Sequence, residues 1–233
     1  MWKLLRSFFC RALTNAWKQI KSSSSDEPQS DLQAIKAEVE NILKLDLSSE
    51  AARESNRDLV LYVLRRLDGE VEDVRQQANG YPANPISALV WMNGAGYGNL
   101  ACALTLHFRD AGWLKCEEKA SALWVKAILS VCSHYHHLVG PAMLANADCH
   151  DRLGNAERAT KMYGAIVMDF ACIANIWRDE SEPPSDEDRI ALESLQTANE
   201  RLLSRGITDL DGIDLAALQS QVQDVLSRPV PDE

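Results

Sequence analysis

Apolar residues recur every three or four positions along most of this chain, a spacing typical of helices that bury one face. The segment 31–45 gives a clear example, with Leu32, Ile35, Val39 and Ile42 on one stripe. Nowhere does a sustained alternation of apolar and polar residues indicate a strand. The pattern therefore predicts an all-α fold in which short polar stretches separate the helices.

The first helical pattern, residues 1–21, combines an apolar stripe with a basic face and contains no acidic residue. Charges interrupt its apolar runs well before the roughly 20 residues that a membrane span needs, and they break the apolar centre of a secretory signal. An interfacial membrane helix, a helix docked on a partner protein, a helix packed on its own domain and a cleaved organelle presequence all fit. The residues expected to dock on a membrane or partner are Trp2, Lys3, Leu5, Arg6, Phe8, Phe9, Arg11, Leu13, Trp17 and Lys18.

Residues 22–30 separate this segment from the rest of the chain. A run of serines followed by Asp26, Glu27 and Pro28 is typical of a flexible, solvated linker. The next two helical patterns, within 31–80, predict a helical hairpin. Ser49 offers an N-cap to the second of them, and the turn at 79–82 ends it.

Residues 81–177 hold most of the aromatic and apolar side chains and predict further helix pairs. A helix opened by Pro85 and Ser87 is expected to run up to the glycine cluster of 93–99 or through it. We interpret the cluster as a turn joining two helices and not as a phosphate-binding loop, because it lacks the lysine of such a loop and follows no strand. Gly140 and Pro141 are expected to end another helix, and the next should run from Pro141 to Leu153. A turn at Gly154 then leads into a helix that reaches about residue 177.

An acidic, proline-containing loop at 178–188 precedes the C-terminal part of the chain. Two capping helices are expected within 189–233. Ser185 or Asp186 offers an N-cap to the first, which should end before Gly206, and the second should open near Asp214.

Two stretches share one spacing of small and aromatic residues. A small residue lets two helices approach, and an aromatic side chain one turn later fills the space beside it. The step between the two copies, from Ala120 to Ala159, is 39 residues. The positions are Ala120, Trp124 and Ala127 in the first copy and Gly154, Ala159 and Tyr163 in the second.

This pattern resembles the tetratricopeptide repeat family, and the long step is nearer to its Sel1-like branch. The resemblance covers about residues 86–175. It implies a helical-repeat array of stacked helix hairpins, capped by flanking helices, that binds other proteins. An unrelated helical bundle would give a similar spacing by coincidence, because packed helices in general favour a small residue beside an aromatic one.

Charge narrows the choice of partners. The chain carries 24 Lys+Arg against 34 Asp+Glu, a net charge of −10 at pH 7. Residues 1–25 contain five basic and no acidic residues, which leaves the remainder at −15. Such a body repels a phosphate backbone, so we expect no nucleic-acid partner, and an anionic membrane can attract only the N-terminal segment.

The six cysteines form no CxxC pair, and a reducing compartment is the simplest interpretation. The weak candidates for metal ligands are Cys132, His136, Cys149 and His150. They would meet across the expected turn at Gly140 and Pro141, although no standard zinc-ligand spacing fixes them.

The sequence thus favours a non-enzymatic protein interaction module or assembly subunit that needs no cofactor. We expect it in the cytoplasm, held at the inner face of a membrane or in a complex by residues 1–21. The alternative is a helical enzyme that uses a metal ion or a cysteine from the 132–150 cluster.

Overall fold

The computed structural model describes residues 30–228 except for 80–87, 132–135, 179 and 181. The predicted helix of 1–21, nearly all of the predicted linker of 22–30, and Cys132 lie outside the described residues. The described elements are the helices α2 (Ser30–Leu43), α3 (Glu50–Ser55), α4 (Arg57–Asn79), α5 (Ala88–Asp110), α6 (Leu114–Val131), α7 (His136–Arg152), α8 (Ala156–Arg178), α9 (Asp186–Leu203) and α10 (Leu215–Leu226), and the strands β1 (Asp209–Leu210) and β2 (Ile213–Asp214).

Across the described residues the fold is all-α, as the apolar periodicity predicts. The exception is the short antiparallel ribbon of β1 and β2 between α9 and α10. Asp211 and Gly212 join its strands with φ angles of 50° and 87°, the left-handed pair that a type I′ turn needs. The Asp-Gly dipeptide is itself a hairpin signal, but strands of two residues are too short to show an alternation.

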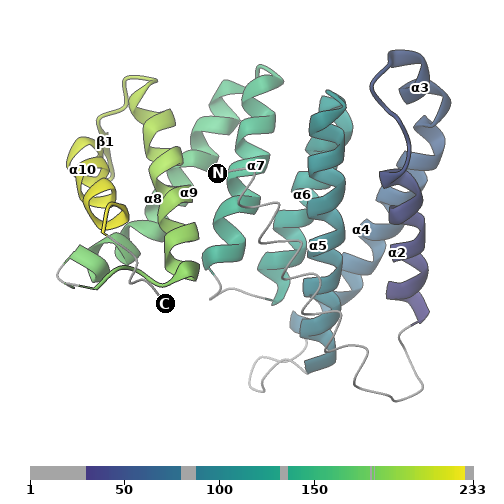
Figure 1. The fold of residues 1–233 in the computed structure, drawn as a ribbon, viewed down its shortest axis with the longest axis horizontal. Helices are drawn as coiled ribbons and strands as arrows, with labels where there is room; N and C mark the ends of the chain where they lie inside the picture. The colour runs from purple at the N-terminus through teal and green to yellow at the C-terminus, as the bar shows by residue number, and fades with distance from the viewer. Residues whose placement is uncertain (1–29, 80–87, 132–135, 179, 181, 229–233) are drawn as a thin grey trace.

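The helices pack in two neighbouring groups that form one elongated row (Figure 1). Helices α2, α4, α5 and α6 pack together at one end, and α7, α8, α9 and α10 at the other. The contact of α6 with α7 joins the groups, and buried apolar side chains run through both as one core. Helix α6 therefore takes part in both halves of the molecule.

The interpretation of 93–99 as a turn is wrong, because this glycine cluster lies inside α5. A Cβ atom on Gly96 would lie 3.0 Å from Leu32 Cδ2 of α2, and one on Gly98 would lie 2.7 Å from Ile128 Cδ1 of α6. Tyr97 between them is buried and donates a hydrogen bond of 3.0 Å to Glu70 Oε2. These glycines thus serve the close approach of α5 to two neighbouring helices.

The expected helix end at Gly140 and Pro141 is also wrong. Both residues lie inside α7, which begins at His136. A Cβ atom on Gly140 would lie 2.6 Å from Phe170 Cε2 and 2.9 Å from Ser194 Cβ, so this glycine lets α7 approach α8 and α9. Pro141 has no N–H and leaves one backbone hydrogen bond of the helix unmade, and the close packing around Gly140 outweighs that loss.

Several predicted helix caps are confirmed. Ser49 caps α3, Ser185 caps α9 and Asp214 caps α10, each by accepting a hydrogen bond from a backbone N–H of the first turn. The helix that Ser49 opens is shorter than expected, since α3 ends at Ser55 and α4 begins at Arg57. The predicted acidic loop is also shorter, because Arg178 still belongs to α8 and residues 186–188 already belong to α9.

Candidate functional site

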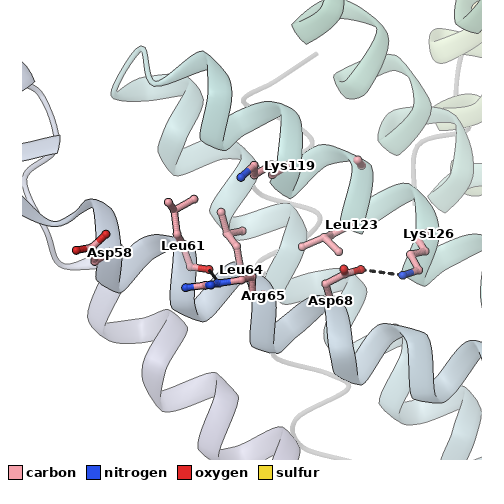
Figure 2. A pocket seen from close by; sticks show the side chains of 9 residues that line it. Asp58, Leu61, Leu64, Arg65, Asp68, Lys119, Leu123 and Lys126 are labelled. Carbon is pink, nitrogen blue, oxygen red and sulfur yellow. Dashed lines mark hydrogen bonds and ion pairs between the residues drawn. The ribbon is translucent and has the colours of Figure 1, made fainter. Parts of the chain in front are cut away.

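A hollow of about 660 Å³ lies on the described surface between α4 and α6. We call it the α4–α6 groove. Figure 2 shows its two walls, with side chains of α4 facing those of α6. Its lining residues are Asp58, Leu61, Leu64, Arg65, Asp68, Lys119, Ala122, Leu123 and Lys126.

Apolar side chains form the floor of the α4–α6 groove. Leu64 and Leu123 are 3% and 7% exposed, Leu61 is half-buried, and Ala122 is exposed. On each helix, apolar and charged lining residues follow one another at steps of three or four positions. Each helix therefore presents one continuous stripe to the groove. The stripe on α4, from Asp58 to Asp68, is about 15 Å long at the helical rise.

Ion pairs close one end of the α4–α6 groove. Lys126 Nζ lies 2.7 Å from Asp68 Oδ1 and 2.9 Å from Glu72 Oε2, which links α6 to α4. Glu72 also pairs with Arg75, at 2.6 Å. Hydrogen bonds from Arg75 and then Lys126 lower the pKa of Glu72 to about 2, so this carboxylate is ionised at neutral pH.

At its other end the groove continues into a second hollow of about 400 Å³ beside α3, which shares Leu61 and Lys119 with it. We call this hollow the α3 pocket. Among the ion pairs of the described residues, none involves Arg65, Lys115 or Lys119. The remaining residues that line the α3 pocket are Glu50, Arg53, Glu54, Arg57, Trp113, Lys115 and Cys116.

A buried polar layer lies beneath the groove, where α6 meets α5 and α7. The fully buried carboxylate of Glu117 accepts a hydrogen bond of 2.8 Å from Arg109 Nε of α5 and another from Arg152 of α7. In the same interface Asn146 donates a hydrogen bond of 2.7 Å to Ser121 Oγ. These contacts fix the position of α6, and therefore of one wall of the groove.

The repeat-like residues lie in the core and do not line the groove. Ala120, Trp124 and Ala127 are buried in α6, and Ala159 and Tyr163 are buried in α8. Gly154 forms the turn between α7 and α8 with a φ of 79°, a conformation that favours glycine. The Tyr163 hydroxyl donates a hydrogen bond of 2.6 Å to Asp148, and the Arg205 guanidinium lies 5.0 Å from the centre of the Tyr163 ring.

Of the predicted Cys/His candidates, Cys132 lies outside the described residues, and the other three lie near opposite ends of α7. His136 is the first residue of α7, whereas Cys149 and His150 lie near its end, about 20 Å away at the helical rise. Such a distance is far beyond the reach of ligands to one metal ion. Across the described residues no group of three or more His, Cys, Asp and Glu side chains could hold a metal ion.

Cys149 and His150 are both buried. The Cys149 thiol donates to the Leu114 carbonyl oxygen at 3.5 Å, and burial, followed by the nearby Glu117 charge, raises its pKa to about 12. Burial and then the charge of Arg158 lower the pKa of His150. The thiol therefore stays protonated at neutral pH, which is opposite to what a nucleophile requires.

Sequence reasoning missed the α4–α6 groove. The available signal was a pair of apolar residues, Leu61 and Ala122, within the charged faces of two helices. Only the packing of α4 against α6 brings these faces side by side.

The predicted membrane-docking residues, from Trp2 to Lys18, lie outside the described residues. Of the helices from α2 to α10, none has both the length and the apolar character that crossing a membrane requires. No family model, curated protein or solved structure matches this chain.

Proposed function

We propose that this protein is a non-enzymatic interaction module, or an assembly subunit, that binds a segment of a partner protein in the α4–α6 groove. The observation that carries this proposal is an open hollow with an apolar floor between two charged helical walls. Apolar side chains of a bound segment would cover Leu61, Leu64 and Leu123, while polar groups at its edges would meet the walls.

The shape of the groove favours a protein segment as its occupant. Its wall on α4 is about 15 Å long, equal to roughly three turns of a helix. The α3 pocket extends it further, past Trp113. A ligand that follows both hollows is elongated, as in the helix-in-groove mode of recognition.

The repeat-like packing supports the same function. We propose that α5 with α6 and α7 with α8 are two helix hairpins of a tetratricopeptide or Sel1-like array, flanked by α4 and α9. The buried Trp124 and Tyr163 support this proposal, and so do the contacts of α6 with α7 and of α7 with α9. Such arrays present their helices as an extended binding surface.

We further propose that residues 1–21 hold the module at the anionic inner face of a membrane, or in a complex. The support is the basic charge and amphipathic pattern of that segment beside a strongly acidic body. The competing enzyme hypothesis draws on the Cys/His cluster of 132–150. Within that cluster, about 20 Å along α7 separates His136 from Cys149.

Co-purification tests the role of the groove. Ala122→Trp would fill the floor of the groove, and Ala217→Trp would place the same bulk on an exposed site of α10, at the other end of the molecule. We expect proteins that co-purify with the tagged wild type from its own cells to be depleted with Ala122→Trp and retained with Ala217→Trp. Equal recovery with both variants would reject the groove as the binding surface.

Vesicle co-sedimentation tests the role of the N-terminal segment. Intact protein should sediment with anionic vesicles at low salt and less at high salt, whereas protein lacking residues 1–25 should stay in solution. Failure of the intact protein to bind would reject the membrane proposal and leave residues 1–21 as a protein-docking element.

A further inference from the structure

Resting on the proposed function above, we infer that the occupant of the α4–α6 groove is an acidic amphipathic helix of a partner protein. Its apolar stripe would lie on the floor formed by Leu61, Leu64 and Leu123. Carboxylates beside that stripe would reach Arg65 on the α4 wall and Lys119 on the α6 wall.

The backbone chemistry of the groove favours a helix over an extended peptide. Both walls are α-helices, whose backbone groups are already paired along each helix. The only strand pair of the described residues, β1 with β2, lies next to α10 and not beside the groove. An extended peptide over the apolar floor would leave its own N–H and C=O groups without partners, whereas a helix satisfies them internally.

The charges around the groove favour an acidic occupant. Together, the α4–α6 groove and the α3 pocket contain more basic than acidic side chains, although residues 26–233 are strongly acidic as a whole. The basic side chains are Arg53, Arg57, Arg65, Lys115, Lys119 and Lys126, and the acidic ones are Glu50, Glu54, Asp58 and Asp68.

Some of these charges already have partners within the protein. Asp68 is engaged by Lys126, and Glu54 by Arg57 at 3.2 Å. Arg65 is exposed and donates only to the Leu61 carbonyl oxygen, at 3.2 Å, and Lys119 is exposed as well. Asp58 and Glu50 of the same lining also take part in no ion pair of the described residues, so the unpaired charges still favour the basic side chains. Arg65 and Lys119 line the open part of the groove, where a carboxylate from outside can reach them.

The same charges disfavour the chain's own N-terminal segment as the occupant. Residues 1–25 carry five basic and no acidic residues, so they would place like charges against Arg65 and Lys119. Occupation by this segment is therefore a contrary outcome of the experiment below.

The experiment uses the full chain and a fluorescent, stapled helical peptide of about three turns. Its apolar stripe is leucine and its flanking positions are glutamate. A charge-reversed peptide carries lysine at each glutamate position. Fluorescence anisotropy at about 50 mM and 300 mM salt gives the two dissociation constants. We expect the acidic peptide to bind at least about tenfold more tightly than the reversed one, with the difference shrinking at high salt.

Matched variants locate the binding site. Arg65→Glu and Lys119→Glu should each weaken the acidic peptide by about fivefold or more and strengthen the reversed one. Arg158→Glu and Lys44→Glu make the same changes at exposed positions outside the groove, and should leave both affinities unchanged.

Equal affinities for the two peptides, tighter binding of the reversed peptide or no binding of either would overturn the inference. So would an increase in affinity for the acidic peptide on deletion of residues 1–25, because the groove would then hold that segment. In each case the proposed function stands or falls separately, by whether Ala122→Trp depletes a natural partner and Ala217→Trp does not.

Discussion

Glu117→Gln removes a buried charge that ties α6 to α5 and α7 without changing the volume of the side chain. The wild-type carboxylate is 0% exposed and accepts hydrogen bonds from Arg109 and Arg152, whose side chains are 18% and 39% exposed. The amide oxygen of Gln can still accept from both, so the loss is that of the charge. Since charge-assisted hydrogen bonds are about twice as strong as neutral ones, each bond loses about 1 kcal/mol.

We discount the part from Arg152, because water can solvate it, and add the cost of placing the largely buried Arg109 guanidinium beside a neutral side chain in place of a carboxylate. The expected loss in the free energy of unfolding is therefore about 2 kcal/mol. Urea titration at pH 7, followed by circular dichroism, measures it as a lower midpoint.

Glu157→Gln is the matched control, because Glu157 forms an exposed pair with Lys161 in α8, with side chains 85% and 74% exposed. Its midpoint should stay close to that of the wild type. A Glu117→Gln midpoint equal to that of the control would refute the reasoning that this carboxylate holds the three helices together.

Three further predictions concern packing and titration. Gly140→Ala should lower the melting temperature and the free energy of unfolding, the latter by about 1–3 kcal/mol, because its Cβ would meet Phe170 at 2.6 Å. Gly69→Ala in α4, with no atom within 4 Å of its Cβ, should raise the free energy of unfolding by about 1 kcal/mol and the melting temperature with it. In native protein at pH 8, peptide mass spectrometry after iodoacetamide treatment should find Cys172, which is exposed, labelled much faster than Cys149, whose thiol has a pKa raised to about 12 by burial; equal labelling would contradict the buried position of Cys149. Burial lowers the pKa of His150 in the folded state, so the unfolded state binds more protons as the pH falls below about 6.5, and stability should decrease there. In urea titrations between about pH 5 and 6.5, His150→Gln should flatten this decrease in the free energy of unfolding. An unchanged dependence on pH would contradict the assignment of the decrease to His150.

Most helices could be predicted from the sequence because their apolar stripes and caps are local signals. The stripe Leu32, Ile35, Val39 and Ile42 is buried in α2 as expected. Asp214 opens α10 by accepting hydrogen bonds of 2.9 and 3.0 Å from Ala216 and Ala217. Such features depend on a few neighbouring residues, so the sequence carries them directly.

The errors came from glycines whose role depends on distant residues. Gly98 and Gly140 resemble helix breakers along the chain, yet each permits a close approach to a neighbouring helix, at Ile128 and at Phe170. The candidate metal ligands were expected to meet across a turn at Gly140 and Pro141, where α7 continues and separates His136 from Cys149 and His150. A sequence pattern does not tell a glycine that ends a helix from one that lets two helices touch.

The groove could not be predicted because it is a property of two helices together. Leu61 and Lys119 are separated by 58 positions in the chain and meet only through the packing of α4 against α6. Each helix alone shows an ordinary solvated face with charges at helical spacing. The excess of cations around the hollow becomes visible only when both walls and their ion pairs are known.

Photo-crosslinking from the floor of the groove in intact cells tests the central claim most directly. A photoreactive amino acid would replace Ala122, and the same group at Ala217 on α10 would serve as the control. We predict a crosslink to one partner protein from position 122 and not from 217, with the crosslinked peptide lying in an acidic amphipathic helix. Crosslinks equal at both positions, or none specific to position 122, would contradict the account.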